Sequence, residues 1–213
     1  MLSISKDFLF IHIPKTGGNS IQNLLIKYSE DEIFIPFKHQ DGIQRFNVKS
    51  SINPILRKHS TISDYKKYLS STVYDNLYKF TTVRNPWDRI VSFYFSPHKA
   101  IDEFDRNEFI KIISQVKPIF YYTHELSLID KLKNSIGLLD QTNSQSAIDF
   151  YLRFENLQYD FDLVCKKIGV ETQQLPKVNS SKRKHYSEYY DNHLKDMVFK
   201  KFKEEINLFN YQF

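Results

Sequence analysis

The segment from Phe8 to Leu25 constrains the fold more than any other part of the chain, because it joins an apolar stretch, a glycine pair and a helix-like apolar pattern. Residues 8–13 are almost all apolar and rich in β-forming types, which predicts a strand buried on both faces. Pro14 cannot donate to a sheet ladder, so we expect the strand to end there. The adjacent Gly17 and Gly18 permit a tight turn and a close backbone approach to a ligand. The segment therefore predicts a strand, a turn and a helix in succession.

The turn after that strand has the chemistry of an anion site. Asn19 or Ser20 is expected to cap the helix, which places backbone N–H groups close to Lys15. A helix N-terminus combined with glycines, a lysine and hydroxyls favours a phosphate or a sulfonate. The segment is not a Walker A loop, because its lysine precedes the glycines. Taken alone, it also fits an ordinary strand-to-helix turn with a surface lysine.

Length, charge and cysteine content narrow the class of protein. A chain of 213 residues fits one domain, which we expect to span residues 1–213. The net charge of +5 favours anionic ligands, but the basic residues are scattered, so we expect no nucleic-acid partner. Cys165 is the only cysteine, and its helix pattern predicts a buried structural residue. With no signal-peptide pattern and no apolar run near ~20 residues, we expect a cytoplasmic protein without a membrane span.

Strand patterns alternate with helix patterns along the chain, which predicts an α/β fold with a mainly parallel central sheet and flanking helices. The predicted strands are residues 8–13, 32–37, 79–83 and 147–154. One helix is predicted after Thr61 or Ser63 as cap, and another starts at Pro86. Residues 103–134 are predicted to be helical with a break near Pro118. The other predicted helices cover residues 71–77, 155–168 and 186–209. Residues 43–60 are expected to be loop or irregular.

A second informative stretch runs from Arg84 to Tyr94. Asn85 is a good helix cap and Pro86 suits the first helical position, so Arg84 should stand at the end of a strand and Ser92 two turns into a helix. Ligands of parallel sheets bind at the carboxyl ends of the strands, where Lys15 also falls. Two such cationic turns can hold a ligand with two separated anionic groups.

Together these segments resemble the sulfotransferases that use 3′-phosphoadenosine 5′-phosphosulfate (PAPS), in particular the carbohydrate O-sulfotransferases and their heparan 2-O-sulfotransferase-related branch. Residues 13–20 are similar to that family's 5′-phosphosulfate loop and residues 83–94 to its 3′-phosphate motif, in the same order and at a matching separation. Residues 154–157 and 175–179 are similar to later blocks of the family. The resemblance implies a P-loop-like three-layer sandwich and a PAPS-dependent enzyme that requires no metal.

The resemblance also implies a role for each matched residue. Lys15 would bridge the sulfonate and the departing phosphate. The 5′-phosphate would be held by backbone N–H groups of residues 16–20, with side chains assisting; the set is Thr16, Gly17, Gly18, Asn19 and Ser20. Arg84 and Ser92 would bind the 3′-phosphate, and Lys182 or Arg183 would reach phosphate from a basic loop.

Transfer to a hydroxyl requires a base, for which we expect His59. In the heparan 2-O-sulfotransferase branch a catalytic histidine occupies a similar place before the 3′-phosphate motif. His39 and Glu155 are the alternatives, and Gln141 could contact an acceptor. His12 should be a core or near-site residue. The other histidines should lie on the surface or on helix faces; they are His98, His124, His185 and His193.

Several functions remain open. The acceptor is expected to be a saccharide hydroxyl, but a small alcohol, a phenol or a lipid also fits the pattern. A nucleotide- or phosphate-binding protein of the same fold without transfer activity is the second hypothesis. An NTP kinase is disfavoured, because the chain has no Walker A loop and no clear Mg²⁺-binding aspartate after an apolar strand. Trp87 is expected to be a core residue.

Overall fold

A mainly parallel four-stranded sheet lies at the centre of the computed structural model, which describes residues 1–30, 32–34, 45–47, 56–96, 103–125, 146–176 and 183–213. The strand order is β1-β2-β5-β6; β2, β5 and β6 are parallel, and β1 pairs antiparallel with β2. The strands are β1 (Leu2–Ser3), β2 (Phe8–Ile11), β5 (Tyr78–Val83) and β6 (Phe150–Arg153). The predicted α/β class and the parallel pairing are confirmed, and the short edge strand β1 is an addition.

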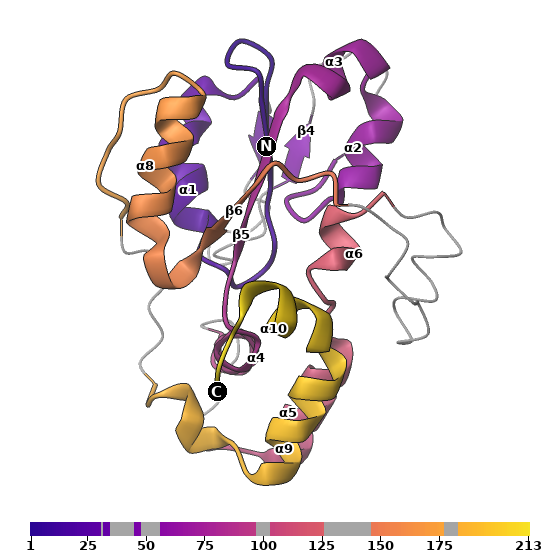
Figure 1. Ribbon diagram of the computed structural model, residues 1–213, viewed down its shortest axis with the longest axis vertical. Coiled ribbons are helices and arrows are strands. Elements are labelled where there is room, and N and C mark those ends of the chain that lie inside the picture. Colours follow the sequence, from indigo (N-terminus) through magenta and orange to yellow (C-terminus); the bar gives the residue numbers. More distant parts are fainter. Residues whose placement is uncertain (31, 35–44, 48–55, 97–102, 126–145, 177–182) are drawn as a thin grey trace.

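Both faces of the sheet are covered, which explains the continuous apolar pattern of β2. Phe8 and Phe10 pack into one cluster of buried side chains, and Leu9 and Ile11 pack into another. Successive side chains of a strand point to opposite faces, so every residue of this strand is buried. Figure 1 shows α1 (Gly18–Leu25) and α8 (Leu157–Lys167) on one side of the sheet, and α2 (Ile62–Tyr68), α3 (Ser71–Asn76) and α6 (Phe120–Thr123) on the other.

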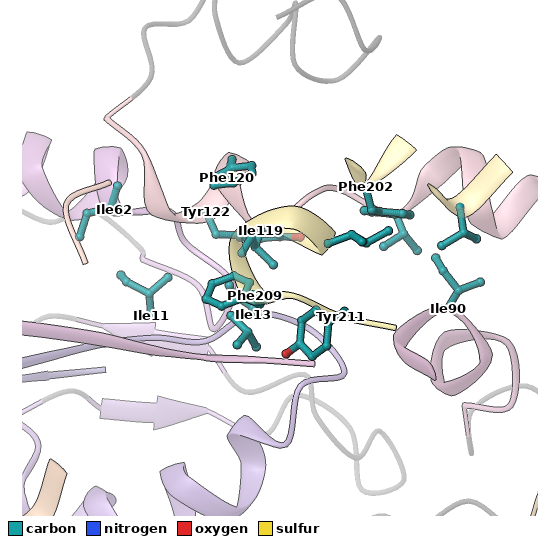
Figure 2. Close-up of a cluster of buried hydrophobic side chains, with 14 of the residues drawn as sticks. Ile11, Ile13, Ile62, Ile90, Ile119, Phe120, Tyr122, Phe202, Phe209 and Tyr211 are labelled. Carbon is teal, nitrogen blue, oxygen red and sulfur yellow. The ribbon is translucent and has the colours of Figure 1, made fainter. Parts of the chain in front are cut away.

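The larger cluster extends beyond the carboxyl ends of the strands. It contains Ile11 and Ile13 from the first parallel strand and its extension, and Phe209 and Tyr211 from the end of the chain (Figure 2). The helices that contribute to it beyond β5 are α4 (Pro86–Tyr94), α5 (Arg106–Gln115), α9 (Asn192–Lys201) and α10 (Lys203–Phe209). The carboxyl end of the sheet is thus framed by helices from distant parts of the sequence.

Local signals set several helix ends as predicted. Asn85 caps α4 by accepting a hydrogen bond from the backbone N–H of Trp87, with Pro86 at the first helical position. Thr61 caps α2 in a reciprocal box with Asp64. The break near Pro118 is confirmed between α5 and α6. None of the helices in the described ranges is long and apolar enough to cross a membrane.

Two predictions about the extent of elements are wrong. The expected helix over 186–209 is divided into a 3-10 turn at Tyr186–Tyr189 followed by α9 and α10. Asp191 caps α9, and Phe202 leaves helical geometry at φ −112° and ψ 20°, which separates the two helices. A strand is confirmed at β3 (Glu32–Phe34), and residues 35–37 of that prediction lie outside the described ranges. It pairs with β4 (Arg45–Asn47) in a separate two-stranded sheet, so the prediction that residues 43–60 are loop or irregular is wrong at β4.

Other short elements complete the description. The 3-10 turns η1 (Ile26–Tyr28) and η3 (Phe154–Asn156) follow α1 and β6 respectively, so β6 ends earlier than predicted. Cys165 is fully buried on α8, as expected, and burial raises the pKa of its thiol to about 11. His124 is not on the surface: it is buried against Phe120, and its Nδ1 lies 3.0 Å from the Thr123 hydroxyl.

Candidate active site

The donor loop, which we define as residues 14–20, connects β2 to α1 with unusual backbone geometry. Lys15 has a φ of +65° and Gly17 a φ of +91°. Helix α1 begins at Gly18, and Gly17 is its N-cap, so the prediction that Asn19 or Ser20 caps the helix is wrong. Because the cap position has no side chain, no capping bond covers the first N–H groups of α1 within the described part of the chain. Such a helix end can bind an anion.

Packing beneath the loop explains why both glycines are needed. A Cβ at Gly17 would lie 2.9 Å from the ring of Phe154. A Cβ at Gly18 would lie only 2.4 Å from Cδ2 of His12, whose buried ring supports the start of α1. The glycine pair therefore lets the helix start press directly against β2 and η3.

The polar side chains of the donor loop are already bonded within the protein. Thr16 is buried, and its hydroxyl donates to the Ile13 carbonyl at 2.8 Å. The Ser20 hydroxyl donates to the Pro176 carbonyl at 2.7 Å, and Oδ1 of Asn19 accepts from the Lys58 ammonium at 2.5 Å. The Ser20 N–H donates to the Gly17 carbonyl at 3.1 Å, so the N–H groups of Gly18 and Asn19, at the start of α1, are the ones that could bind an anion. Phosphate contacts by these three side chains stay a prediction.

Arg84 and Lys15, predicted to meet, do lie together. Arg84 follows β5, and its Nη1 donates to the carbonyl oxygen of Lys15 at 3.3 Å. The Lys15 ammonium lies 3.4 Å from the Ser96 hydroxyl. Partial burial, with the nearby charges of Arg84 and Arg183, lowers the pKa of Lys15 to about 8. The two turns thus form one cationic region at the carboxyl edge of the sheet.

A second group, which we call the arginine cluster, consists of Arg84, Asp88 and Arg183. Oδ2 of Asp88 accepts from Nε of Arg84 at 2.8 Å and lies 2.7 Å from its Nη2, while Oδ1 binds the Arg183 guanidinium. The Arg84 guanidinium also lies over the Phe154 ring at 3.8 Å. Burial lowers the pKa of the Arg84 guanidinium. The neighbouring Asp88 carboxylate opposes this shift. Sequence reasoning missed Asp88, because Arg84 precedes the cap of α4 and the spacing rule for ion pairs within a helix does not apply to it.

His59 is positioned by the end of the β2 strand. Its Nδ1 lies 2.8 Å from the His12 carbonyl oxygen, and since a carbonyl can only accept, Nδ1 carries the proton and Nε2 the lone pair. The two imidazole rings meet edge to face with centroids 5.0 Å apart. Burial lowers the pKa of His59 to about 4, opposed by this hydrogen bond. The ring is therefore neutral near pH 7, with Nε2 able to accept a proton, but a pKa near 4 makes it a weaker base than an ordinary imidazole.

Lys58 is a functional candidate that sequence reasoning missed. Its side chain is buried, and its bond to Asn19 places the ammonium at the first turn of α1. It also directly precedes His59, so the same short segment brings a cation and a base to the helix N-terminus. The sequence shows only that Lys58 is next to His59. Its partner Asn19 lies far away in the sequence, so their contact could not be predicted.

The remaining predicted residues differ in what surrounds them. Ser92 is buried on α4, and its contact with a phosphate stays a prediction. Glu155 accepts from the backbone N–H of Asn85 at 2.8 Å and lies 3.4 Å from the Tyr211 hydroxyl, which favours a structural role over that of a base. Trp87 is buried in the larger cluster as expected. The residues His39, Gln141 and Lys182 lie outside the described ranges.

Comparison with known proteins gives one informative match. A family model described as the sulfotransferase family matches residues 2–212. No curated protein matches the chain significantly. Within the described ranges, no three histidine, cysteine or acidic side chains are grouped so that they could hold a metal ion.

Proposed function

The chain belongs to the sulfotransferase family, and we propose that it moves a sulfonate group from PAPS to an acceptor hydroxyl, in the first place on a glycan. The observation that carries this proposal is the hydrogen bond from Arg84 to the Lys15 carbonyl. This hydrogen bond brings the N-terminus of α1, which has no side-chain cap, close to the largely buried guanidinium groups of Arg84 and Arg183. One ligand could therefore contact both regions. PAPS has two matching anionic ends, a 5′-phosphosulfate and a 3′-phosphate.

The residues present fit this donor. A Cβ on either glycine would collide with Phe154 or His12, so the glycine pair fixes the start of α1 against the protein, where its first N–H groups could bind an anion. We assign the 5′-phosphosulfate to the N–H groups of the donor loop, and the 3′-phosphate to Arg84, Ser92 and Arg183. The Arg84 guanidinium has further N–H donors beyond those bonded to Asp88 and Lys15, which suits a phosphate.

Each side chain near the loop then has a chemical task. His59 takes the proton of the acceptor hydroxyl on Nε2 while the hydroxyl oxygen bonds to sulfur. The bond between that sulfur and the 5′-phosphate oxygen breaks, and its electron pair stays on the phosphate. Lys15, Lys58 and the α1 N-terminus stabilise the charge that develops on this oxygen. The sulfonate donor carries the reactive group, so the proposal requires no metal.

The finer parts of the proposal concern the class of enzyme. We propose a P-loop-like three-layer sandwich in one domain spanning residues 1–213, of the carbohydrate O-sulfotransferase type and related to the heparan 2-O branch. Helices on both sides of a mainly parallel sheet support the architecture. The single cysteine supports the expectation of a cytoplasmic location.

The decisive experiment measures transfer of labelled sulfate from PAPS to a panel of glycans, lipids, small alcohols and phenols. Wild type should label at least one class, and Lys15→Met should lower kcat about 100- to 1,000-fold, as for loss of one oxyanion-stabilising group. Lys66→Met, an exposed lysine on α2, is the matched control and should transfer like wild type. Tight binding of adenosine 3′,5′-bisphosphate without transfer to any acceptor would instead favour the binding-protein hypothesis.

A further inference from the structure

A buried ion pair between α4 and α10 stands outside the chemistry described above. Arg89 and Glu205 are 1% and 2% exposed. Nη1 of Arg89 lies 3.9 Å from Oε1 of Glu205, which is too long for a hydrogen bond. Both atoms are buried and have no hydrogen-bond partner among the residues that the structure describes.

Such a pair is a poor way to stabilise a core. Removing two charges from water is costly, and a loosely matched pair does not recover that cost. Burial raises the pKa of Glu205 to about 7, which reflects this penalty. Apolar residues of similar volume are often equally stable in such positions. The pair therefore calls for another explanation.

Its remaining bonds lead to the donor loop. Nε of Arg89 donates to the Pro14 carbonyl at 3.1 Å, and Nη2 donates to the Lys117 carbonyl at 3.2 Å. Oε2 of Glu205 accepts from the backbone N–H of Ile119 at 2.8 Å. The guanidinium is thus held between α10, the segment before α6 and the first residue of the donor loop.

Two consecutive carbonyls of the loop are held by two arginines. The Pro14 carbonyl faces Arg89 and the Lys15 carbonyl faces Arg84. In a planar trans peptide the N–H points opposite to the C=O, so the N–H groups of Lys15 and Thr16 point away from these guanidiniums. The same peptides flank the left-handed Lys15, a conformation that persists only when its surroundings impose it.

We propose that Arg89, held in place by Glu205, is a positioning residue that fixes the donor loop in its anion-binding conformation. The part of this inference that concerns transfer rests on the proposed function. The part that concerns the loop backbone does not, so the two can be tested separately.

The test is the double variant Arg89→Met/Glu205→Leu. Its thermal midpoint should stay close to that of wild type, because removal of the buried charges offsets the loss of the hydrogen bonds to Pro14, Lys117 and Ile119. Amide exchange in a peptide covering residues 12–20 should nevertheless become at least about tenfold faster, since the Pro14 anchor is lost. The KM for PAPS should rise and kcat fall, each by about tenfold. The exposed pair of α9 gives the matched control, Lys200→Met/Asp196→Leu, which should change none of these.

Wild-type exchange in the loop of a folded double variant would overturn the proposal, whether or not the wild type uses PAPS. Absence of both bisphosphate binding and transfer in wild type would instead defeat the proposed function. If the double variant does not fold, Arg89→Lys decides. It keeps the charge opposite Glu205 but lacks the planar fork that reaches two carbonyls. Faster loop exchange at an unchanged thermal midpoint supports the positioning role, and unchanged exchange overturns it.

Discussion

The donor loop and the arginine cluster differ in the groups that they offer to an anion. In the loop the side chains of Thr16, Asn19 and Ser20 are bonded within the protein, so we expect backbone N–H groups, with Lys15 beside them, to bind the anion. In the cluster the charge is on side chains, and Asp88 neutralises it in part. The loop should therefore be sensitive to added volume and insensitive to loss of a hydroxyl. The cluster should be sensitive to charge.

The largest effect should come from one added methyl group in the loop. In Gly18→Ala the new Cβ would lie 2.4 Å from the His12 ring, so α1 and β2 must separate. We expect a loss of about 1–3 kcal/mol in unfolding free energy and at least about 100-fold in kcat/KM for PAPS. Denaturant unfolding and steady-state kinetics measure these.

A double variant isolates the cause of that loss. Gly18→Ala combined with His12→Ala removes the colliding ring, so the double variant should be more stable than the sum of the two single changes predicts. Strict additivity would mean that the clash is not the reason for glycine at this position, and that backbone-anion contact alone requires it.

The next largest effect should come from charge in the cluster. Arg84→Met should raise the KM for PAPS about 100-fold, because the guanidinium that we assign to the 3′-phosphate is lost. Adenylyl sulfate lacks that phosphate, so its kcat/KM should fall much less. Arg106→Met, an exposed arginine at the start of α5, is the control. Equal losses for both donors would place the 3′-phosphate elsewhere.

The contrast also explains which features could be predicted from sequence. The strand, the glycine turn and the start of α4 depend on neighbours within a few residues, so local rules identified them. Lys58 and Asn19, or Arg89 and Glu205, come together only when distant segments pack. No periodic pattern reports such a contact, which is why these pairings were missed.

Boundary errors have a similar origin. The pattern over 186–209 remains apolar on one side, so it predicts one helix; the side-chain cap at Asp191 and the departure at Phe202 divide it. At α1, the hydroxyl and amide residues looked like caps. The helix instead starts at Gly18, after the left-handed Gly17, and only glycine fits against His12 at position 18. Tertiary packing overrode the local cap preference in this case.

As the pH falls, stability should be lost around His59 and the donor loop before it is lost around the arginine cluster. The pKa of His59 falls from its ordinary 6.5 to about 4, so stability present above pH 6.5 is lost as the pH falls toward 4. Glu205, whose pKa is raised from 4.5 to about 7, acts in the opposite direction over pH 7 to 4.5. The test compares two proteins: between pH 7 and pH 5, wild type should lose about 2 kcal/mol more unfolding free energy than His59→Gln. Parallel pH curves would show that the ring is protonated as readily in the folded state as in the unfolded chain.

The smallest effect should come from Ser20→Ala. Its hydroxyl donates to the Pro176 carbonyl, so its removal should lower unfolding free energy by about 1 kcal/mol. Affinity for adenosine 3′,5′-bisphosphate, measured by calorimetry, should stay within about threefold of wild type, because the backbone N–H groups remain. A tenfold or larger loss of affinity at unchanged stability would mean that the hydroxyl turns to the phosphate on binding. The loop would then also bind anions through side chains, and its contrast with the arginine cluster would disappear.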